Sequence, residues 1–152
     1  RPLSERVVLV LVRPGGERPV RRLTERPVRP AREVPAIGRR GRVEGAGGVL
    51  VPLAGRLLFA DLFARWGAPV VLVSRTALGT INHSLLSIEA LRSRGVEILG
   101  VAFVGGPRPE SGAASLRLGQ GPAVGRLPWL DPLNRETLGA ALAEHIDLAA
   151  FR

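Results

Sequence analysis

The sequence predicts an α/β domain in which helices flank a parallel β-sheet. Short apolar runs rich in valine and leucine alternate with stretches of helical periodicity, and Gly67 and Gly95 each follow one of those stretches. Apolar runs of this length are typical of strands buried on both faces. Strands and helices that alternate at this spacing form right-handed β-α-β units, so we expect a three-layer, Rossmann-type arrangement.

The expected elements follow the chain in a simple order. The β-branched run at residues 7–12 is predicted to be the first buried strand. Further strands are predicted at residues 69–73, 96–104 and 123–127. Helices are predicted at residues 57–66, 81–94 and 135–148. The polar, Gly-rich segment 107–121 has room for one short helix.

The first 42 residues differ from the rest in composition. Five prolines between residues 13 and 42 are too closely spaced for a long helix, so this stretch is predicted to be irregular or poorly ordered. We therefore divide the chain into a basic, Pro- and Arg-rich segment at 1–42 and an α/β domain at 43–152. The chain starts at Arg1 and contains no Met and no Lys, which indicates a fragment, a processed product or an incomplete gene model.

The net charge of +9 is concentrated in the first segment, where 12 arginines face four glutamates. A basic arm can bind nucleic acid or anionic membranes, but this one lacks the aromatic side chains on which single-strand binders stack bases. GC-rich coding explains arginine without lysine better, so we expect no nucleic-acid and no membrane partner. The lack of a long apolar run or secretory pattern favours a cytoplasmic protein, and the lack of cysteine excludes thiol chemistry.

Three strand-to-helix loops are candidate binding sites, because ligands of parallel sheets bind beyond the carboxyl ends of the strands. The first, at residues 44–48, joins Glu44 to Gly45, Ala46, Gly47 and Gly48. A carboxylate is a ligand that magnesium accepts, and small residues let a ligand approach the backbone closely. A tight Gly turn with a solvated glutamate explains these residues equally well.

The second loop, at residues 74–82, leaves a strand, passes Gly79 and is expected to open a helix at Thr80 or Asn82. Free backbone N–H groups and the positive end of the helix dipole would bind an anion such as a substrate carboxylate. Thr80 could instead be an ordinary N-cap, but that role would not account for the rest of the loop. A lone His83 in the first turn is expected to be structural rather than catalytic.

The third loop, at residues 127–131, begins with Leu127 and Pro128. Pro128 in this loop and Pro132 directly after it favour an extended path that could pass along the flat face of a base. Trp129 within it could equally belong to the core.

Taken together, the three segments resemble the dethiobiotin synthetase family. Residues 43–53, which read Val-Glu-Gly-Ala-Gly-Gly and later Val-Pro-Leu, are similar to the glutamate loop of that family. The most specific match lies within residues 69–91, above all Leu-Gly-Thr-Ile-Asn-His at 78–83. Residues 95–102 and 125–128 continue the similarity, which covers about 43–138.

The resemblance implies a P-loop NTPase-like fold, a homodimer, and an ATP- and Mg²⁺-dependent ligase of biotin biosynthesis. The substrates would be 7,8-diaminononanoate and carbon dioxide or bicarbonate, and the product dethiobiotin. By the same resemblance, Glu44 would hold magnesium beside the backbone loop at 45–48. The diamine's carboxylate would be bound, across the dimer interface, by Leu78, Gly79, Thr80, Ile81 and Asn82. Leu127 and Pro128 would lie against the nucleotide base.

The sequence also departs from this family. It contains no Gly-rich phosphate loop ending in Lys-Thr, and it lacks the family's second lysine near the carbamate. Val104 stands where an adenine-reading Asn is common. The missing loop supplies much of the positioning and charge stabilisation in phosphoryl transfer, so we assign no catalytic residue and expect this chain alone to be impaired. The alternatives are a non-catalytic dimeric remnant of the fold and another P-loop ATPase relative.

Overall fold

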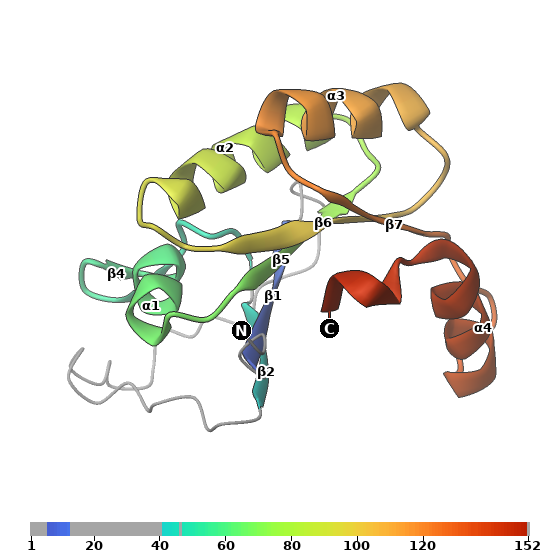
Figure 1. Cartoon of the computed structure of the whole chain (residues 1–152), viewed down its shortest axis with the longest axis horizontal. Helices are drawn as coiled ribbons and strands as arrows, with labels where there is room; N and C mark the ends of the chain where they lie inside the picture. Colours follow the sequence, from blue (N-terminus) through green and yellow to red (C-terminus); the bar gives the residue numbers. More distant parts are fainter. Residues whose placement is uncertain (1–5, 13–40, 46, 152) are drawn as a thin grey trace.

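The fold is built on a five-stranded parallel sheet with the strand order β2-β1-β5-β6-β7 (Figure 1). The computed structural model describes residues 6–12, 41–45 and 47–151, the first two ranges as backbone only. The strands of the sheet are β1 (Arg6–Val12), β2 (Gly41–Gly45), β5 (Val70–Arg75), β6 (Ile98–Val104) and β7 (Ala123–Leu127). The predicted α/β fold and the predicted first strand are confirmed. Residues 13–40 of the segment predicted to be irregular lie outside the described residues.

The direction of the strand order changes beside β1. This strand pairs with β2 on one side, with Leu9 opposite Glu44, and with β5 on the other, with Val12 opposite Ser74. The chain therefore continues from β1 to β2 toward one edge of the sheet, and from β5 to β6 toward the other. Such a switch opens a crevice at the carboxyl ends of the two central strands, which is where ligands of doubly wound sheets bind.

Helices lie on both sides of the sheet. They are α1 (Phe59–Trp66), α2 (Thr80–Arg92), α3 (Pro109–Gly119), α4 (Arg135–His145) and the 3₁₀-helix η2 (Leu148–Phe151). Figure 1 shows α2 and α3 over one face, with α4 and η2 toward the other, which confirms the three-layer prediction. Within the described part of the chain, no helix is long and apolar enough to cross a bilayer.

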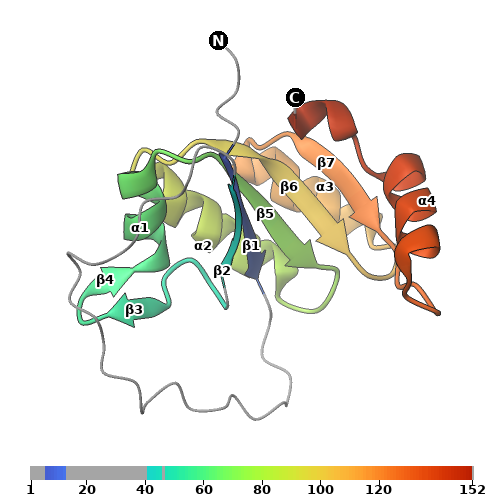
Figure 2. The same cartoon turned by 90° about the horizontal axis from the view of Figure 1, so that it is seen from below.

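The helix predicted at 81–94 spans Thr80–Arg92, and two other helix boundaries differ for a reason that the fold supplies. The helix predicted from residue 57 starts at Phe59, because Leu57 and Leu58 form β4 (Leu57–Leu58) and pair with β3 (Pro52–Ala54) in a small hairpin (Figure 2). The last helix ends at His145 rather than at residue 148. There the chain becomes extended, and Ile146 forms an isolated bridge with Gly125 of β7. In both cases a backbone partner elsewhere in the fold overrides helical periodicity.

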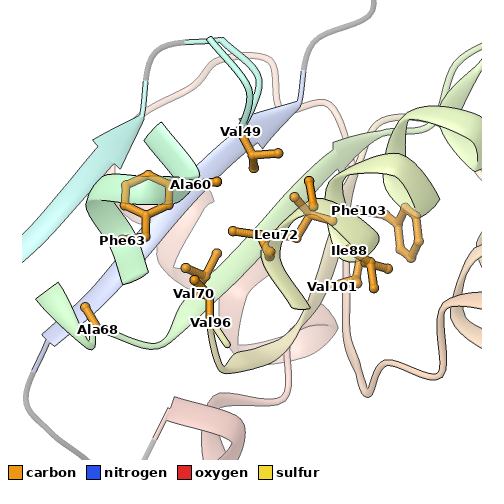
Figure 3. Packing of buried hydrophobic residues seen from close by; sticks show 12 residues of the cluster. Val49, Ala60, Phe63, Ala68, Val70, Leu72, Ile88, Val96, Val101 and Phe103 are labelled. Atoms are coloured by element: carbon orange, nitrogen blue, oxygen red, sulfur yellow. The ribbon is translucent and has the colours of Figure 1, made fainter. Parts of the chain in front are cut away.

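The core lies between the sheet and the helices α1 and α2 (Figure 3). Phe63 of α1, Leu72 of β5 and Leu91 of α2 are completely buried in it. Helices α2 and α3 also approach each other closely, because a Cβ atom on Gly119 would lie 2.6 Å from Cδ1 of Ile88. Both β5 and α2 are thus anchored in the core, so the loop that joins them is held firmly at each end.

Candidate ligand-binding site at the carboxyl edge of the sheet

A pocket of about 670 Å³ opens at the start of α2, beyond the carboxyl end of β5. The pocket lies at the edge of the sheet where the strand order predicts ligand binding. The residues proposed from the sequence to hold a substrate all line it: Leu78, Gly79, Thr80, Ile81 and Asn82. Ala77, Leu85 and Arg108 complete the wall. The structure therefore brings these residues together, and their role in binding stays a prediction.

The loop that forms the pocket turns tightly from strand to helix. Ala77 N donates to Arg75 O at 2.9 Å and Thr80 N donates to Ala77 O at 3.1 Å. Gly79 then adopts φ +88°, a left-handed conformation that favours glycine. A Cβ atom at this position would also lie 3.2 Å from Cδ2 of His83. Glycine is required here both by backbone conformation and by the imidazole packed against it.

Helix α2 begins at Thr80, and Gly79 is its N-cap. The interpretation of Thr80 as an N-cap is therefore wrong, because the capping position is taken by the residue that can adopt the left-handed turn. Gly79 has no side chain with which to cap the helix, and the first turn contains no acidic residue. Within the described residues, the amides of Ile81 and Asn82 have no hydrogen-bond acceptor. The first turn thus presents unpaired N–H groups and the positive end of the helix dipole.

Buried hydroxyl groups hold this turn from beneath. Ser74 Oγ and Ser84 Oγ lie 2.9 Å apart, and both side chains are fully buried. Ser87 Oγ donates to His83 O at 2.8 Å. Thr80 is only 5% exposed, yet its Oγ1 has no hydrogen-bond partner in the described part of the chain. The hydroxyl pair fixes the end of β5 to α2, and the Thr80 hydroxyl is left unsatisfied.

The rim of the pocket is exposed. Leu78 is 96% exposed, which is unusual for a leucine in a tight turn, and Asn82 is also exposed. His83 is exposed as well but does not belong to the pocket wall, where its ring packs against Gly79 instead. Its structural rather than catalytic role stays a prediction.

A second group of residues gathers at the carboxyl ends of β5, β6 and β7. Gly105 N donates to Leu127 O at 2.9 Å, and the guanidinium of Arg126 donates to Gly105 O at 2.7 Å. The guanidinium of Arg75 lies 5.5 Å from the centroid of the Trp129 ring, in the geometry of a cation–π contact. These contacts fix the chain at Leu127, so the following residues leave the sheet edge in a defined direction.

Trp129 does not belong to the core, because it is 65% exposed. Its ring stands beside Gly105, where a Cβ atom would collide with Oγ1 of Thr76 and lie 3.5 Å from Nε1 of the indole. Leu127 and Pro128, proposed to lie against a base, are both half-buried in the same region. The proposed nucleotide contact of these two residues remains a prediction, but an exposed aromatic face lies next to them.

The glutamate loop starts at the same edge of the sheet. Glu44 and Gly45 are the last residues of β2, while Ala46 and the Glu44 side chain lie outside the described residues. Gly47 is exposed with φ +95°, and Gly48 O accepts a hydrogen bond from Val51 N at 3.1 Å. The described residues contain no cluster of three or more His, Asp or Glu that could hold a metal. A single carboxylate suits a magnesium ion that keeps its waters and phosphate ligands.

Sequence reasoning did not single out Arg108, and it gave no role to Arg75 or to an exposed Trp129. Arg108 follows β6 directly, in the loop that leads to α3. The rule that selected the other strand-to-helix loops applies to this one too, so the loop could have been chosen as a candidate, whereas its place beside the start of α2 could not be read from the sequence. Arg75 and Trp129 lie in two loops that the same rule did select, but their contact could not be foreseen, because it joins residues far apart in the sequence.

The parallel sheet flanked by helices, with a pocket at its carboxyl edge, defines an α/β protein of the doubly wound class, and comparison with known proteins agrees with this class. A family model described as an AAA domain matches residues 32–137, so the chain belongs to that P-loop NTPase-like family. The resemblance to dethiobiotin synthetases is confirmed by relatives that carry this name.

Three of these relatives are called ATP-dependent dethiobiotin synthetase BioD. The protein of Rhizorhabdus wittichii is 60% identical over 109 residues, which cover 72% of this chain and 52% of the relative. That of Rhodopseudomonas palustris is 55% identical over 111 residues, covering 73% and 53%. That of Agrobacterium fabrum is 52% identical over 109 residues, covering 72% and 51%. The chain thus spans about half the length of the curated relatives it matches.

Proposed function

We propose that this chain carries the diamine-binding part of a dethiobiotin synthetase, an ATP- and Mg²⁺-dependent ligase. The observation that supports the proposal is the pocket at the start of α2, where an uncapped helix turn meets an apolar wall. A carboxylate would accept hydrogen bonds from the free amides of that turn. The carbon chain of the same molecule would lie along Leu78, Ile81 and Leu85. 7,8-Diaminononanoate has both parts.

The reaction would proceed in three steps. One amine of the diamine attacks carbon dioxide and loses a proton, which gives a carbamate. The γ-phosphoryl group of ATP is transferred to a carbamate oxygen, and ADP is released. The second amine then attacks the carbamate carbon, and phosphate leaves as the ring of dethiobiotin closes. Charge develops on the phosphoryl oxygens in the second step, so that step depends most on positively charged groups.

The described residues would contribute mainly by binding and orienting the substrates. The first turn of α2 would fix one end of the diamine, which limits where its amines can lie. Leu127, Pro128 and the exposed Trp129 would offer a flat surface to the base of ATP. Glu44 would hold magnesium, which neutralises charge on the phosphates when bound.

We propose further that the chain alone is impaired in phosphoryl transfer. Its 152 residues include no lysine and no Gly-rich loop ending in Lys-Thr, and positive charge from such a loop stabilises the transferred phosphoryl group. A non-catalytic remnant that keeps the fold and the dimer surface is the second candidate. The absence of lysine favours it, whereas the intact pocket favours retained diamine binding.

The proposal includes a homodimer in which the loop at 78–82 reaches the partner's site. Leu78 supports this, because an almost fully exposed leucine at the rim of a pocket is typical of a residue that contacts another molecule. Sedimentation velocity of the chain would measure the assembly. A Leu78→Ser variant is expected to weaken any dimer with little change in the stability of the fold, because the side chain is 96% exposed among the described residues.

Two assays separate diamine binding from catalysis. Titration calorimetry with 7,8-diaminononanoate at low millimolar concentration should give saturable heat, and Asn82→Ala should weaken the binding. Absence of saturation would disprove the retained diamine site. A turnover assay with ATP, Mg²⁺, bicarbonate and the diamine should give little or no dethiobiotin. Efficient turnover would show that the chain is a competent ligase despite its missing lysines.

A further inference from the structure

Arg108 lines the same pocket as the first turn of α2. It is the N-cap residue of α3 and stands four residues after the end of β6, so the sheet brings it to the carboxyl edge independently of the loop at 77–82. Among the described residues that line the pocket, Arg108 alone carries a charge. The pocket therefore has one cationic side chain beside its apolar wall.

Within the described part of the chain, the guanidinium of Arg108 makes no hydrogen bond and no ion pair. Three other arginines do: Arg94 pairs with Asp61, Arg92 donates to Gln120 O and Arg126 donates to Gly105 O. Arg108 is exposed and has no hydrogen bond or ion pair with any described side chain. Glu110, two residues further along, is also exposed and forms no ion pair with it. An unpaired guanidinium is free to bind a carboxylate in a bidentate fashion.

A second positive feature faces the same space. The first turn of α2 has no capping side chain and no acid, and its amides at Ile81 and Asn82 lack acceptors among the described residues. Thr80 lines the pocket, and its buried hydroxyl has no partner there. A buried hydroxyl without a partner costs free energy. This unsatisfied hydroxyl belongs to the turn that lines the pocket.

The rest of the wall is apolar. Ala77, Leu78, Ile81 and Leu85 supply no charged group and no side-chain hydrogen-bond donor. A ligand that fits must therefore carry a negative group at one end and an aliphatic chain at the other. A phosphate or a sugar would leave most of this wall without a matching surface, whereas an aliphatic carboxylate matches both parts.

We propose that Arg108 binds the carboxylate of an aliphatic acid held at the start of α2, and so makes the pocket specific for acids over uncharged or purely cationic chains. This inference rests on the proposed function, and it adds a specificity-determining residue contributed by a different loop. The carboxylate lies between the α2 amides and the Arg108 guanidinium. Its carbon chain runs along Ile81 and Leu85.

Titration calorimetry of the full chain with three probes tests the inference. The probes are 7,8-diaminononanoate, nonanoate, which has the carboxylate but no amines, and 2,3-diaminooctane, which has the amines but no carboxylate. Arg108→Gln should weaken binding of both acids by about three- to tenfold, since the exposed pair is partly screened by solvent. The affinity of Arg108→Lys should lie between those of the natural chain and Arg108→Gln, because lysine keeps the charge but not the bidentate geometry.

The matched control is Arg117→Gln, which removes an exposed charge of the same kind from α3 outside the pocket. It should leave the affinity for all probes unchanged. Raising the ionic strength should weaken nonanoate binding to the natural chain more than to Arg108→Gln, which a purely structural role of Arg108 would not produce. Thermal unfolding of each variant checks that the fold is retained.

The outcomes distinguish this inference from the proposed function. If the natural chain and Arg108→Gln bind 7,8-diaminononanoate equally well, the role of Arg108 is disproved while the diamine site stands. Nonanoate could bind in an Arg108-dependent manner while 7,8-diaminononanoate binds no more tightly than nonanoate. In that case the role of Arg108 is supported and the proposed function fails. If neither acid binds the natural chain, both are overturned.

Discussion

Helices α2 and α4 start in opposite ways. At α4, Asn134 and Thr137 cap each other: Thr137 N donates to Asn134 Oδ1 at 2.9 Å, and Asn134 N donates to Thr137 Oγ1 at 3.1 Å. At α2, the N-cap is Gly79, no described side chain accepts a hydrogen bond from the amides of the first turn, and the turn opens into a pocket. One helix start is closed by its own residues, and the other is open to a ligand.

Burial explains why the two helices can differ. Ala141 is the only residue of α4 that is buried, so this helix gains little from packing and depends on its cap. By contrast, α2 buries residues along its whole length, including Ile88 and Leu91 in the main core. A cap is worth about 1 kcal/mol, which the buried face of α2 offsets. A helix anchored in the core can leave its first turn free for binding.

The largest expected effect comes from replacing the glycine at the open helix start. Gly79→Ala should destabilise the fold by about 1–2 kcal/mol, because alanine is strained at φ +88° and its Cβ would press on the His83 ring. The control is Gly139→Ala within α4, where a Cβ atom would meet nothing within 4 Å. That change should stabilise the fold by about 0.5–1 kcal/mol. Urea unfolding measures the stability of both variants. Equal changes in stability would contradict the requirement for glycine at the start of α2.

A smaller effect is expected when an asparagine is removed from each helix start. Asn134→Ala should cost about 1 kcal/mol of stability, because it removes the reciprocal cap of α4. Asn82→Ala in α2 should change stability by less than about 0.5 kcal/mol, since its exposed side chain has no partner among the described residues. It should instead weaken diamine binding. A large loss of stability with Asn82→Ala would show that α2 also depends on a cap.

The smallest effect concerns a third helix start, that of α1, where a carboxylate caps the backbone. Asp61 accepts from the Arg94 guanidinium at 2.7 Å and from Leu58 N at 2.9 Å. The bond from Arg94, and then that from Leu58, holds the pKa of Asp61 below its ordinary value of 3.8. Its stabilisation is therefore complete above that value and is lost as the pH falls through the folded pKa.

The pair is partly exposed to solvent, so we expect less than about 1 kcal/mol from it. Asp61→Asn should flatten the dependence of stability on pH below about pH 4, measured by urea unfolding at a series of pH values. Arg94→Gln should have the same effect, since it removes the main cause of the lowered pKa. An unchanged pH dependence in both variants would show that the pair adds nothing to stability.

Much of this fold could be predicted because its signals are local. The apolar runs gave all the strands of the sheet except β2, and Gly67 marked the end of α1 by adopting the left-handed conformation at φ 57°. The hairpin of β3 and β4 was missed, since Leu57 and Leu58 suit a helix as well as a strand. Only the pairing with residues 52–54 decides between the two.

The candidate site also has one part that the local sequence predicts and another that depends on contacts between distant residues. The loop at 78–82 could be recognised from the sequence, because a strand, a glycine and a helix start follow one another closely. Arg108 could not be assigned to the pocket that way, since it stands 26 residues after Asn82 in the numbering and reaches the pocket only because β6 lies beside β5. The contact between Arg75 and Trp129 likewise depends on β7 lying next to β6.

The sequence by itself therefore determined the parallel α/β class, the family, and the glycine-initiated turn at the start of α2. These follow from apolar periodicity and from the backbone freedom of single residues, which act over a few positions. The tertiary structure decided which charged and aromatic side chains meet at the carboxyl edge, and left the first turn of α2 unpaired inside a pocket. Those outcomes depend on strand order and burial, which join residues that are distant along the chain.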